Sequence, residues 1–193
     1  MNFCYSKKAK NVIYYCSRKG FPMNNTYNDF EYLNIIKNII NNNEYKEIGN
    51  CLHHGTSRLK HSLRVSYYSY KVAKLLNLDY KETAIGGLLH DFFITDNYNK
   101  VNKKVSSTFK HPKIALSNAN EAFNITEKEQ DIIVSHMFPV VLNKVPKYLE
   151  SWIVSIVDKL VGSYEFIQEY QKLCKVKFRN SYVLLALFIS KMV

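Results

Sequence analysis

The stretch that most constrains the architecture runs from Asp79 to Asp91 and reads DYKETAIGGLLHD. Asp79 with Glu82 three residues later is the pattern of a helix capping box, so we expect a helix that ends near Asp91. Gly86 and Gly87 lie inside this helix, where each costs about 1 kcal/mol relative to alanine. A close crossing with a neighbouring helix would offset that cost. The stretch ends on a histidine–aspartate pair.

Helical periodicity continues upstream of this stretch. One helix has an apolar face that consists of Phe30, Leu33, Ile36, Ile39 and Ile40, and the asparagine run 41–43 ends it. A histidine-bearing loop at 51–55 follows. The next helix covers 57–76 and has an apolar stripe made of His61, Val65, Tyr68, Val72 and Leu76.

Four further helices are expected downstream of a polar loop at 92–110. The first begins at His111, because Pro112 suits the first helical position. The second begins at a capping box, Thr126–Glu129, and reaches His136. The last two cover 152–170 and 182–192.

No segment alternates apolar and polar residues with the β-branched enrichment of a strand. We therefore expect an all-α fold, a helical bundle of about six to eight helices around one core. The 193 residues suffice for one such domain at 26–193. A basic arm at 1–25 would precede it, with Lys7, Lys8, Lys10, Arg18 and Lys19 and no acidic residue. No stretch reaches the roughly 18–20 continuous apolar residues of a transmembrane helix, so we expect no membrane span.

The chain carries a formal net charge of +11, from 27 lysines and arginines against 16 acidic residues. Such an excess is typical of proteins that bind nucleic acid or membrane surfaces. Nucleic-acid and phosphate sites favour arginine, however, and only Arg18, Arg58, Arg64 and Arg179 are arginines. The accompanying asparagine, isoleucine and tyrosine are what AT-rich codons produce. Coding bias is therefore the preferred explanation of the charge, and nucleic acid is the less favoured partner.

The four cysteines, Cys4, Cys16, Cys51 and Cys174, form no C-x-x-C pair, and the sequence has no secretory signal pattern. We therefore expect reduced thiols in a cytoplasmic protein.

Six residues stand out as chemically active: His61, His90, Asp91, His111, His136 and Asp158. Asp158 follows the apolar run 152–157, so its carboxylate is expected to be buried and to need a cation or hydrogen-bond donors. His61 continues an apolar stripe and is expected to face the core. The others are expected at helix ends, with His111 as an N-cap and His136 in a last turn, where side chains can converge.

Each of these residues alone has a simpler explanation, namely a hydrogen-bonded core histidine or an aspartate in a salt bridge. Together, histidine and carboxylate are the ligand set of Mn, Fe, Co, Ni or Zn with open coordination positions. Ligands separated by whole helices are typical of metal sites in a bundle core. The lack of paired C-x-x-C motifs argues against a structural zinc site.

The order His61, His90-Asp91, Asp158 resembles the signature of the HD-domain superfamily, which consists mainly of metal-dependent phosphohydrolases. The local contexts agree: HSLRV at 61–65, GGLLHD at 86–91 and IVDK at 156–159. His111-Pro112 and Ser135-His136 resemble the two-metal subgroup, ordered H…HD…H…H…D. The resemblance covers roughly residues 50–170. Phe92-Phe93 after the HD pair departs from the continuation found in some cyclic-dinucleotide phosphodiesterases, which argues against that substrate group.

The resemblance implies two divalent metal ions. His61, His90, Asp91 and Asp158 would hold the first, and Asp91 would bridge to a second held by His111 and His136. The ions would be Fe, Mn, Co, Ni or Zn, with Mg as a further option.

The resemblance also implies a hydrolase that cleaves a phosphomonoester or a nucleotide-type phosphodiester or anhydride with a hydroxide between the metals. Asp91 and Lys159 would be catalytic residues. The candidates for binding a small anionic phosphate-containing substrate are Arg64, Lys159 and His54. Simpler roles stay open for each: a surface arginine, a lysine paired with a carboxylate, and a solvated loop histidine.

Two other functions stay open. A mixed-valent di-iron oxygenase, similar to myo-inositol oxygenase, uses the same fold and ligands. A regulatory or nucleic-acid-binding module with a vestigial metal site would account for the basic arm, although six intact ligands argue against it. The loop 92–110 holds Lys100, Lys103, Lys104 and Lys110, so it is a candidate lid over an anionic substrate. The apolar run 182–189 is expected to be a buried helix or an oligomer contact, so a homo-oligomer is compatible with the sequence.

Overall fold

A computed structural model describes residues 29–50, 52–53, 56–94, 104–142 and 144–190. In these residues the chain forms seven α-helices and a 3₁₀ helix. The helices are α2 (Phe30–Asn41), α3 (Asn43–Glu47), η2 (Ile48–Asn50), α4 (Arg58–Leu75), α5 (Tyr80–Leu89), α7 (Lys104–Ala122), α8 (Glu127–Ser135) and α9 (Leu149–Ser190). The predicted all-α fold is confirmed. The arm at 1–25 and His54 lie outside the described residues.

A short two-stranded β-sheet forms where the sequence predicts a histidine-bearing loop. The strands β1 (Leu52–His53) and β2 (Thr56–Ser57) pair antiparallel, with His53 opposite Thr56. Ser57 ends the pair and caps α4, because its side chain accepts a hydrogen bond from the Lys60 amide. The pair therefore sets the point at which α4 begins.

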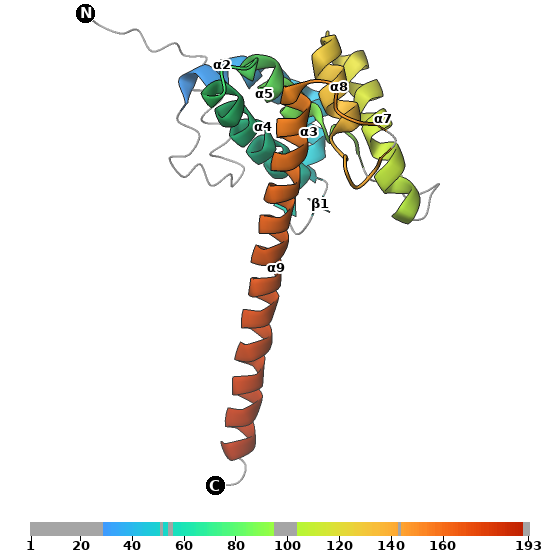
Figure 1. The fold of residues 1–193 in the computed structure, drawn as a ribbon. Coiled ribbons are helices and arrows are strands. Elements are labelled where there is room, and N and C mark those ends of the chain that lie inside the picture. Colours follow the sequence, from blue (N-terminus) through green and yellow to red (C-terminus); the bar gives the residue numbers. More distant parts are fainter. Residues whose placement is uncertain (1–28, 51, 54–55, 95–103, 143, 191–193) are drawn as a thin grey trace, which may run out of the picture.

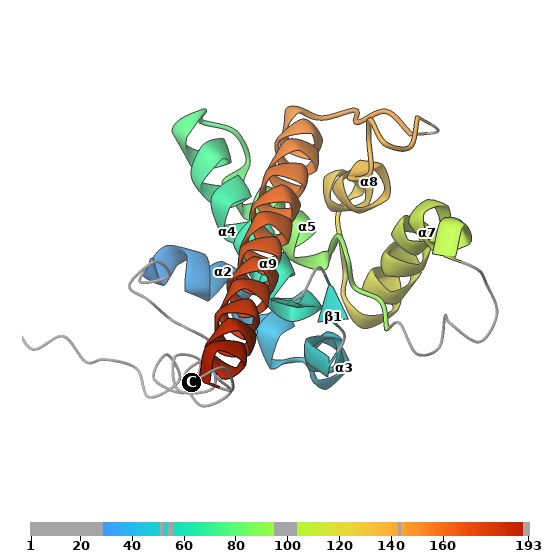
Figure 2. The same ribbon diagram turned by 90° about the horizontal axis from the view of Figure 1, so that it is seen from below.

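Helices α4 and α5 form the centre of the bundle. Helix α9 packs against both of them, α8 packs against α5 and α9, and α7 packs against α8. Viewed from below, α9 passes across the centre, with α2 on one side and α7 and α8 on the other (Figure 2). Helix α9 also extends well beyond the body of the molecule (Figure 1).

The face that α4 buries differs from the predicted stripe. His61 and Val65 are buried as predicted, but Tyr68, Val72 and Leu76 are 46%, 37% and 55% exposed. The buried side of α4 is broader than the predicted stripe. It includes the large residues Leu63, Tyr67 and Tyr70 and also small residues at helical spacing, namely Ser62, Ser66, Ser69 and Ala73. The predicted stripe omits the small residues, of which Ser66 lies at the close contact with α5.

The contact between α4 and α5 explains the two glycines of α5. A Cβ on Gly87 would lie 3.2 Å from the Ser66 Cα atom of α4, and one on Gly86 would lie 2.8 Å from the Ile132 side chain of α8. The predicted close crossing is therefore confirmed, on two sides of α5 at once. Asp79 caps α5 through a hydrogen bond from the Glu82 amide, but its own amide donates to Glu150 at 3.1 Å instead of to Glu82.

Two predicted helix boundaries are wrong. Helix α7 begins at Lys104, so Pro112 lies inside it and His111 is in its interior instead of at an N-cap. The segments 152–170 and 182–192, predicted as two helices, belong to the single helix α9, which begins at Leu149 and ends at Ser190. The candidate lid is correspondingly shorter, since 104–110 is helical and 95–103 lies outside the described residues. The side chains of the apolar run 182–189 also lie outside them.

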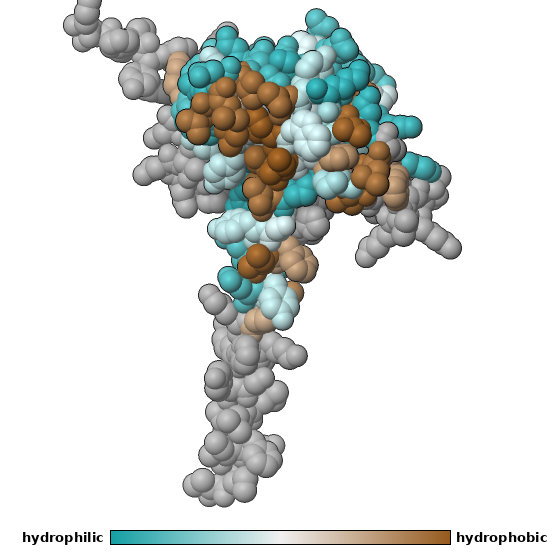
Figure 3. Space-filling model, viewed as in Figure 1, coloured by the Kyte–Doolittle hydropathy of each residue, from teal (hydrophilic) through white to brown (hydrophobic). Residues whose placement is uncertain are grey.

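The described core contains four of the site residues among its most buried side chains. His61, His90, Asp91 and His136 are each at most 3% exposed, alongside apolar neighbours such as Leu89 and Val154. Other apolar side chains remain exposed, and Figure 3 shows them gathered in patches on one face and along α9. They include Leu75, Leu149, Ile156 and Leu160. In the part of the chain that the structure describes, no helix combines the length and the apolar character of a membrane span.

Candidate metal centre

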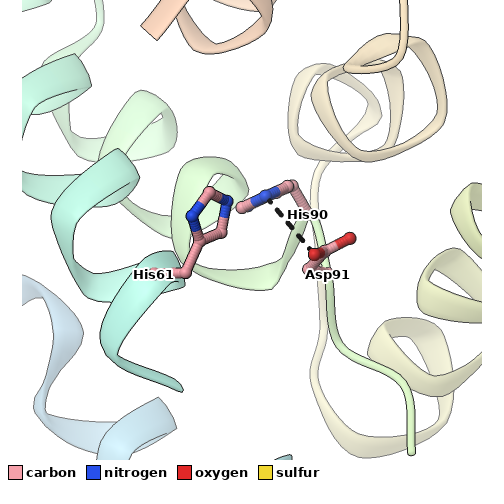
Figure 4. Close-up of side chains that lie close together, drawn as sticks. All are labelled: His61, His90 and Asp91. Carbon is pink, nitrogen blue, oxygen red and sulfur yellow. Dashed lines mark ion pairs between the residues drawn. The ribbon is translucent and has the colours of Figure 1, made fainter. Parts of the chain in front are cut away.

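The histidine–aspartate pair lies where α5 ends. His90 is the C-cap of α5, and its Nδ1 atom lies 2.8 Å from the Gly87 carbonyl, which leaves Nε2 directed into the core. Asp91 follows, and its Oδ2 atom is 3.9 Å from His90 Nε2. Figure 4 shows His61 of α4 reaching toward this pair from the opposite side. The end of α5 therefore places two side chains in the space that α4 borders.

The carboxylate of Asp91 lies between two groups of histidines. Its Oδ1 atom is 3.5 Å from His111 Nε2 and 3.8 Å from His136 Nε2. Its Oδ2 atom is nearer to His90. His111 comes from the interior of α7 and His136 from the C-cap of α8. The two carboxylate oxygens of Asp91 thus face different histidine nitrogen atoms.

Asp158 of α9 closes the opposite side of the cluster. Its Oδ1 atom lies 3.0 Å from His61 Nε2 and 3.5 Å from His90 Nε2. The structure therefore brings all six predicted ligands together, from five different helices or their ends. In three groups of three, the potential ligand atoms lie within 4.8 Å of one another: His61, His90 and Asp91; His90, His136 and Asp158; and Asp91, His111 and His136.

The charges of the cluster compensate one another. Burial lowers the pKa of His61, but its hydrogen bonds to Asp158 and Glu165 outweigh that effect and raise the pKa to about 10. Burial raises the pKa of Asp158, but the hydrogen bond from His61 and the attraction of the nearby His90 ring, whose Nε2 atom is 3.5 Å away, bring it well below its ordinary value. Burial and the neighbouring His90 and His111 lower the pKa of His136 to about 3. His136 is therefore neutral, and because its Nδ1 atom donates to the Ile133 carbonyl, the lone pair that a metal ligand needs lies on Nε2, which faces His111 and Asp91.

Two observations fit a metal ion. The buried His90 Nε2 atom has no hydrogen-bond partner in the described structure, although buried polar atoms rarely lack one. The Nε2 atoms of His111 and His136 are 3.0 Å apart, and two nitrogens bound to one ion at about 2.1 Å each lie about 3.0–3.4 Å apart. Each Nδ1 atom of His90 and His136 is engaged by a backbone carbonyl, which directs the Nε2 atoms inward. The donor set and its arrangement therefore suit transition-metal ions.

The other predicted site residues lie at different places around the cluster. Lys159 contacts Asp158 Oδ2 at 3.2 Å and also donates to the His136 carbonyl. Arg64 lies behind His61, where its guanidinium donates to Glu165 at 2.6 Å. Lys159 also lines a pocket together with Trp152, and a second pocket is lined by Phe109 and Lys113; neither of these two pockets is lined by any of the six clustered residues.

Sequence reasoning missed two residues that touch the ligands. Glu165 Oε2 lies 2.9 Å from His61 Nδ1, and its signal in the sequence is the seven-residue spacing from Asp158 on an apolar helix. Arg58 lies one turn before His61, with its Nε atom 3.8 Å from Asp91 Oδ2 and its guanidinium carbon 3.7 Å from the centre of the Phe93 ring. Its position on the same face as His61 could have indicated it.

Comparison with known proteins agrees with this geometry. Searches of curated proteins and of solved structures found no match at the threshold applied. A family model for the HD domain matches residues 58–162, which is more than half of the chain and includes all six clustered residues. HD domains are generally metal-dependent phosphohydrolases. The chain therefore belongs to the HD domain family.

Proposed function

We propose that this protein is a phosphohydrolase that uses two metal ions to cleave a phosphomonoester or a nucleotide-type phosphodiester or anhydride. The observation that carries the proposal is the position of Asp91. Its Oδ1 faces His111 and His136, while its Oδ2 faces His90. A carboxylate in that position can bind two ions at once, and paired ions serve phosphoryl transfer in many hydrolases.

Six side chains would hold the two ions. The first would be bound by His61, His90, Asp91 and Asp158, and the second by Asp91, His111 and His136. Imidazole and carboxylate ligands favour Mn, Fe, Co, Ni or Zn, and Mg is compatible with the carboxylates. When bound, such ions supply Lewis acidity at a phosphoryl oxygen and lower the pKa of water toward neutrality.

The side chains around the ligands would orient the substrate. Asp158 and His111 are the most accessible ligands of the cluster, with side chains 15% and 11% exposed. A phosphate would therefore approach at their edge. Lys159 lies beside Asp158, and its ammonium group is well placed to neutralise charge on that phosphate. Because the ligands lie at depth, a small anionic substrate is favoured over a polymer.

Phosphate release from a substrate panel tests this proposal. The protein, loaded with Mn²⁺ or Fe²⁺, would be incubated with phosphomonoesters, nucleotides and nucleotide diesters, with a His111→Ala variant in parallel. We expect phosphate release by the parent protein from at least one compound and a loss of at least a hundredfold in the variant. Oxygen consumption that depends on substrate and releases no phosphate would contradict the hydrolase and favour a di-iron oxygenase.

A further inference from the structure

Both nitrogen atoms of His61 are engaged by carboxylates from α9. Nε2 lies 3.0 Å from Asp158 Oδ1, and Nδ1 lies 2.9 Å from Glu165 Oε2. His61 and Glu165 are 1% and 3% exposed, so water does not compete for this contact. A histidine that binds a metal through one nitrogen commonly donates the other N–H to a carboxylate. Glu165 is the carboxylate at Nδ1, away from the other clustered residues, whereas Asp158 faces Nε2 and belongs to the cluster.

Helix geometry explains how one element supplies both partners. Asp158 and Glu165 are seven residues apart on α9, which is two turns and about 10.5 Å along the axis. Residues at this spacing share a face. The imidazole of His61 reaches from α4 into the gap between the two carboxylates, so the ring is held at both edges.

Glu165 is itself held by a second contact from α4. Arg64 lies one turn after His61 and donates to Glu165 Oε1 at 2.6 Å. Each oxygen of Glu165 therefore receives one donor, His61 on one side and Arg64 on the other. A buried carboxylate is costly unless it is paired, and Arg64 supplies a cation for Glu165 that is not part of the metal cluster.

We propose that Glu165, anchored by Arg64, is a positioning residue that holds His61 with Nδ1 protonated and Nε2 directed at the first metal ion. The inference rests on the metal site of the proposed function and not on the reaction. It also assigns Arg64 the role of anchoring Glu165, instead of the contact with substrate phosphate that the sequence suggests.

The test compares Glu165→Gln with a matched control, Glu169→Gln. His61 and Arg64 contact different oxygens of Glu165. Glutamine has an oxygen at only one of these two positions, so its NH₂ group would face one of the two donors. Glu169 is one turn further along α9, and its side chain is 39% exposed beside Lys172. We expect the affinity for Mn²⁺ to fall about 10- to 100-fold in Glu165→Gln and to change less than about twofold in Glu169→Gln, because exposed ion pairs contribute little.

Two further measurements separate positioning from a general structural effect. Arg64→Met keeps Glu165 and removes the arginine that anchors it, so we expect a loss of Mn²⁺ affinity that is smaller than the loss in Glu165→Gln. This variant also tests the inference if Glu165→Gln does not fold. Nitrogen-15 NMR of the Zn²⁺-loaded protein should show a protonated Nδ1 on His61 in the parent protein and a shift of that signal in Glu165→Gln.

The possible failures are distinguishable. A parent protein that binds no Mn²⁺ would overturn both this inference and the two-metal function. If the parent binds Mn²⁺ and Glu165→Gln binds it equally well, with an unchanged His61 signal, the positioning role alone is overturned. Absence of phosphate release, with the affinity loss present, would leave the positioning role intact and overturn only the reaction.

Discussion

The buried carboxylates of this protein have different partners that offset the cost of their burial. Asp91 and Asp158 face histidines, and Glu165 faces both a histidine and an arginine. Glu129 is 4% exposed and has the Thr126 amide at 2.9 Å as its donor, in the capping box of α8. Burial raises the pKa of Glu129 to about 7, against the lowering effect of that hydrogen bond. Glu129 is therefore a source of pH-dependent stability that is separate from the metal cluster.

The variant Glu129→Gln should remove this dependence. Because the pKa of Glu129 is raised in the folded protein, the stability from its protonated form is complete below pH 4.5, its ordinary value, and is lost as the pH rises through about 7. Glutamine keeps an oxygen for the Thr126 amide and does not ionise. Urea unfolding at pH 5 and pH 8 should therefore show the variant gaining stability relative to the parent protein at the higher pH. If the stability difference between the variant and the parent protein is the same at pH 5 and at pH 8, the expectation is contradicted.

Among single residues, the six that cluster could be predicted as a group because their order and residue types are unusual together. Glu165 and Arg58 could not be predicted with equal ease, because their partners belong to other segments. The contact between Glu165 and His61 depends on how α9 is aligned along α4, which local sequence does not specify. Likewise, Arg58 gains its role only because the end of α5 brings Asp91 and Phe93 to it.

At the element scale, the close contacts of α5 align the helices that carry the ligands. Gly86 faces Ile132 of α8, and Gly87 faces Ser66 of α4. His90 and Asp91 follow directly, so a displacement of α5 would move both ligands. The small residues on either side of the crossing therefore support the geometry of the cluster as well as the packing.

Gly86→Ala tests this element directly, with Gly162→Ala of α9 as its control. A methyl group at Gly86 would lie 2.8 Å from two carbon atoms of Ile132, whereas nothing lies within 4 Å of one at Gly162. Overpacking costs about 1–3 kcal/mol, which exceeds or cancels the gain of about 1 kcal/mol in helix propensity. Urea unfolding should show Gly162→Ala as the more stable variant by at least about 1 kcal/mol. Equal stabilisation by both would show that the crossing is not tight.

The element boundaries show where local signals suffice. The capping box of Thr126 and Glu129 predicts the start of α8 correctly, because both hydrogen bonds form between neighbouring residues. Pro112 does not mark the start of α7, since a proline fits a first turn and also, at the loss of one hydrogen bond, a helix interior. Helix α9 continues between 170 and 182, where the sequence has neither glycine nor proline to end it.

At the scale of the whole molecule, the cluster connects five helices. Its six side chains come from α4, α7 and α9 and from the ends of α5 and α8. A metal ion that binds the folded chain and not the unfolded one stabilises the fold by mass action. The site is therefore expected to affect global stability and not only activity.

Thermal unfolding in Mn²⁺ and in EDTA measures this coupling. Free Mn²⁺ at a hundred times its dissociation constant should add about 2.7 kcal/mol, which raises the Tm of a chain of this length by about 5–10 °C. In Asp158→Ala, which lacks one ligand of the first ion, the increase should be smaller. Identical Tm values for the parent protein in Mn²⁺ and in EDTA would contradict metal binding to the fold.

Metal stoichiometry is the direct test of whether Asp91 bridges two metal ions. The parent protein and Asp91→Ala, both purified without chelators and dialysed against Mn²⁺, would be analysed for bound metal per chain, with circular dichroism as the check on folding. Because Asp91 is a ligand of both ions, we predict two equivalents in the parent protein and fewer than one in the variant. A folded Asp91→Ala variant that retains two equivalents, or a parent protein that binds none, would contradict the bridging role of Asp91.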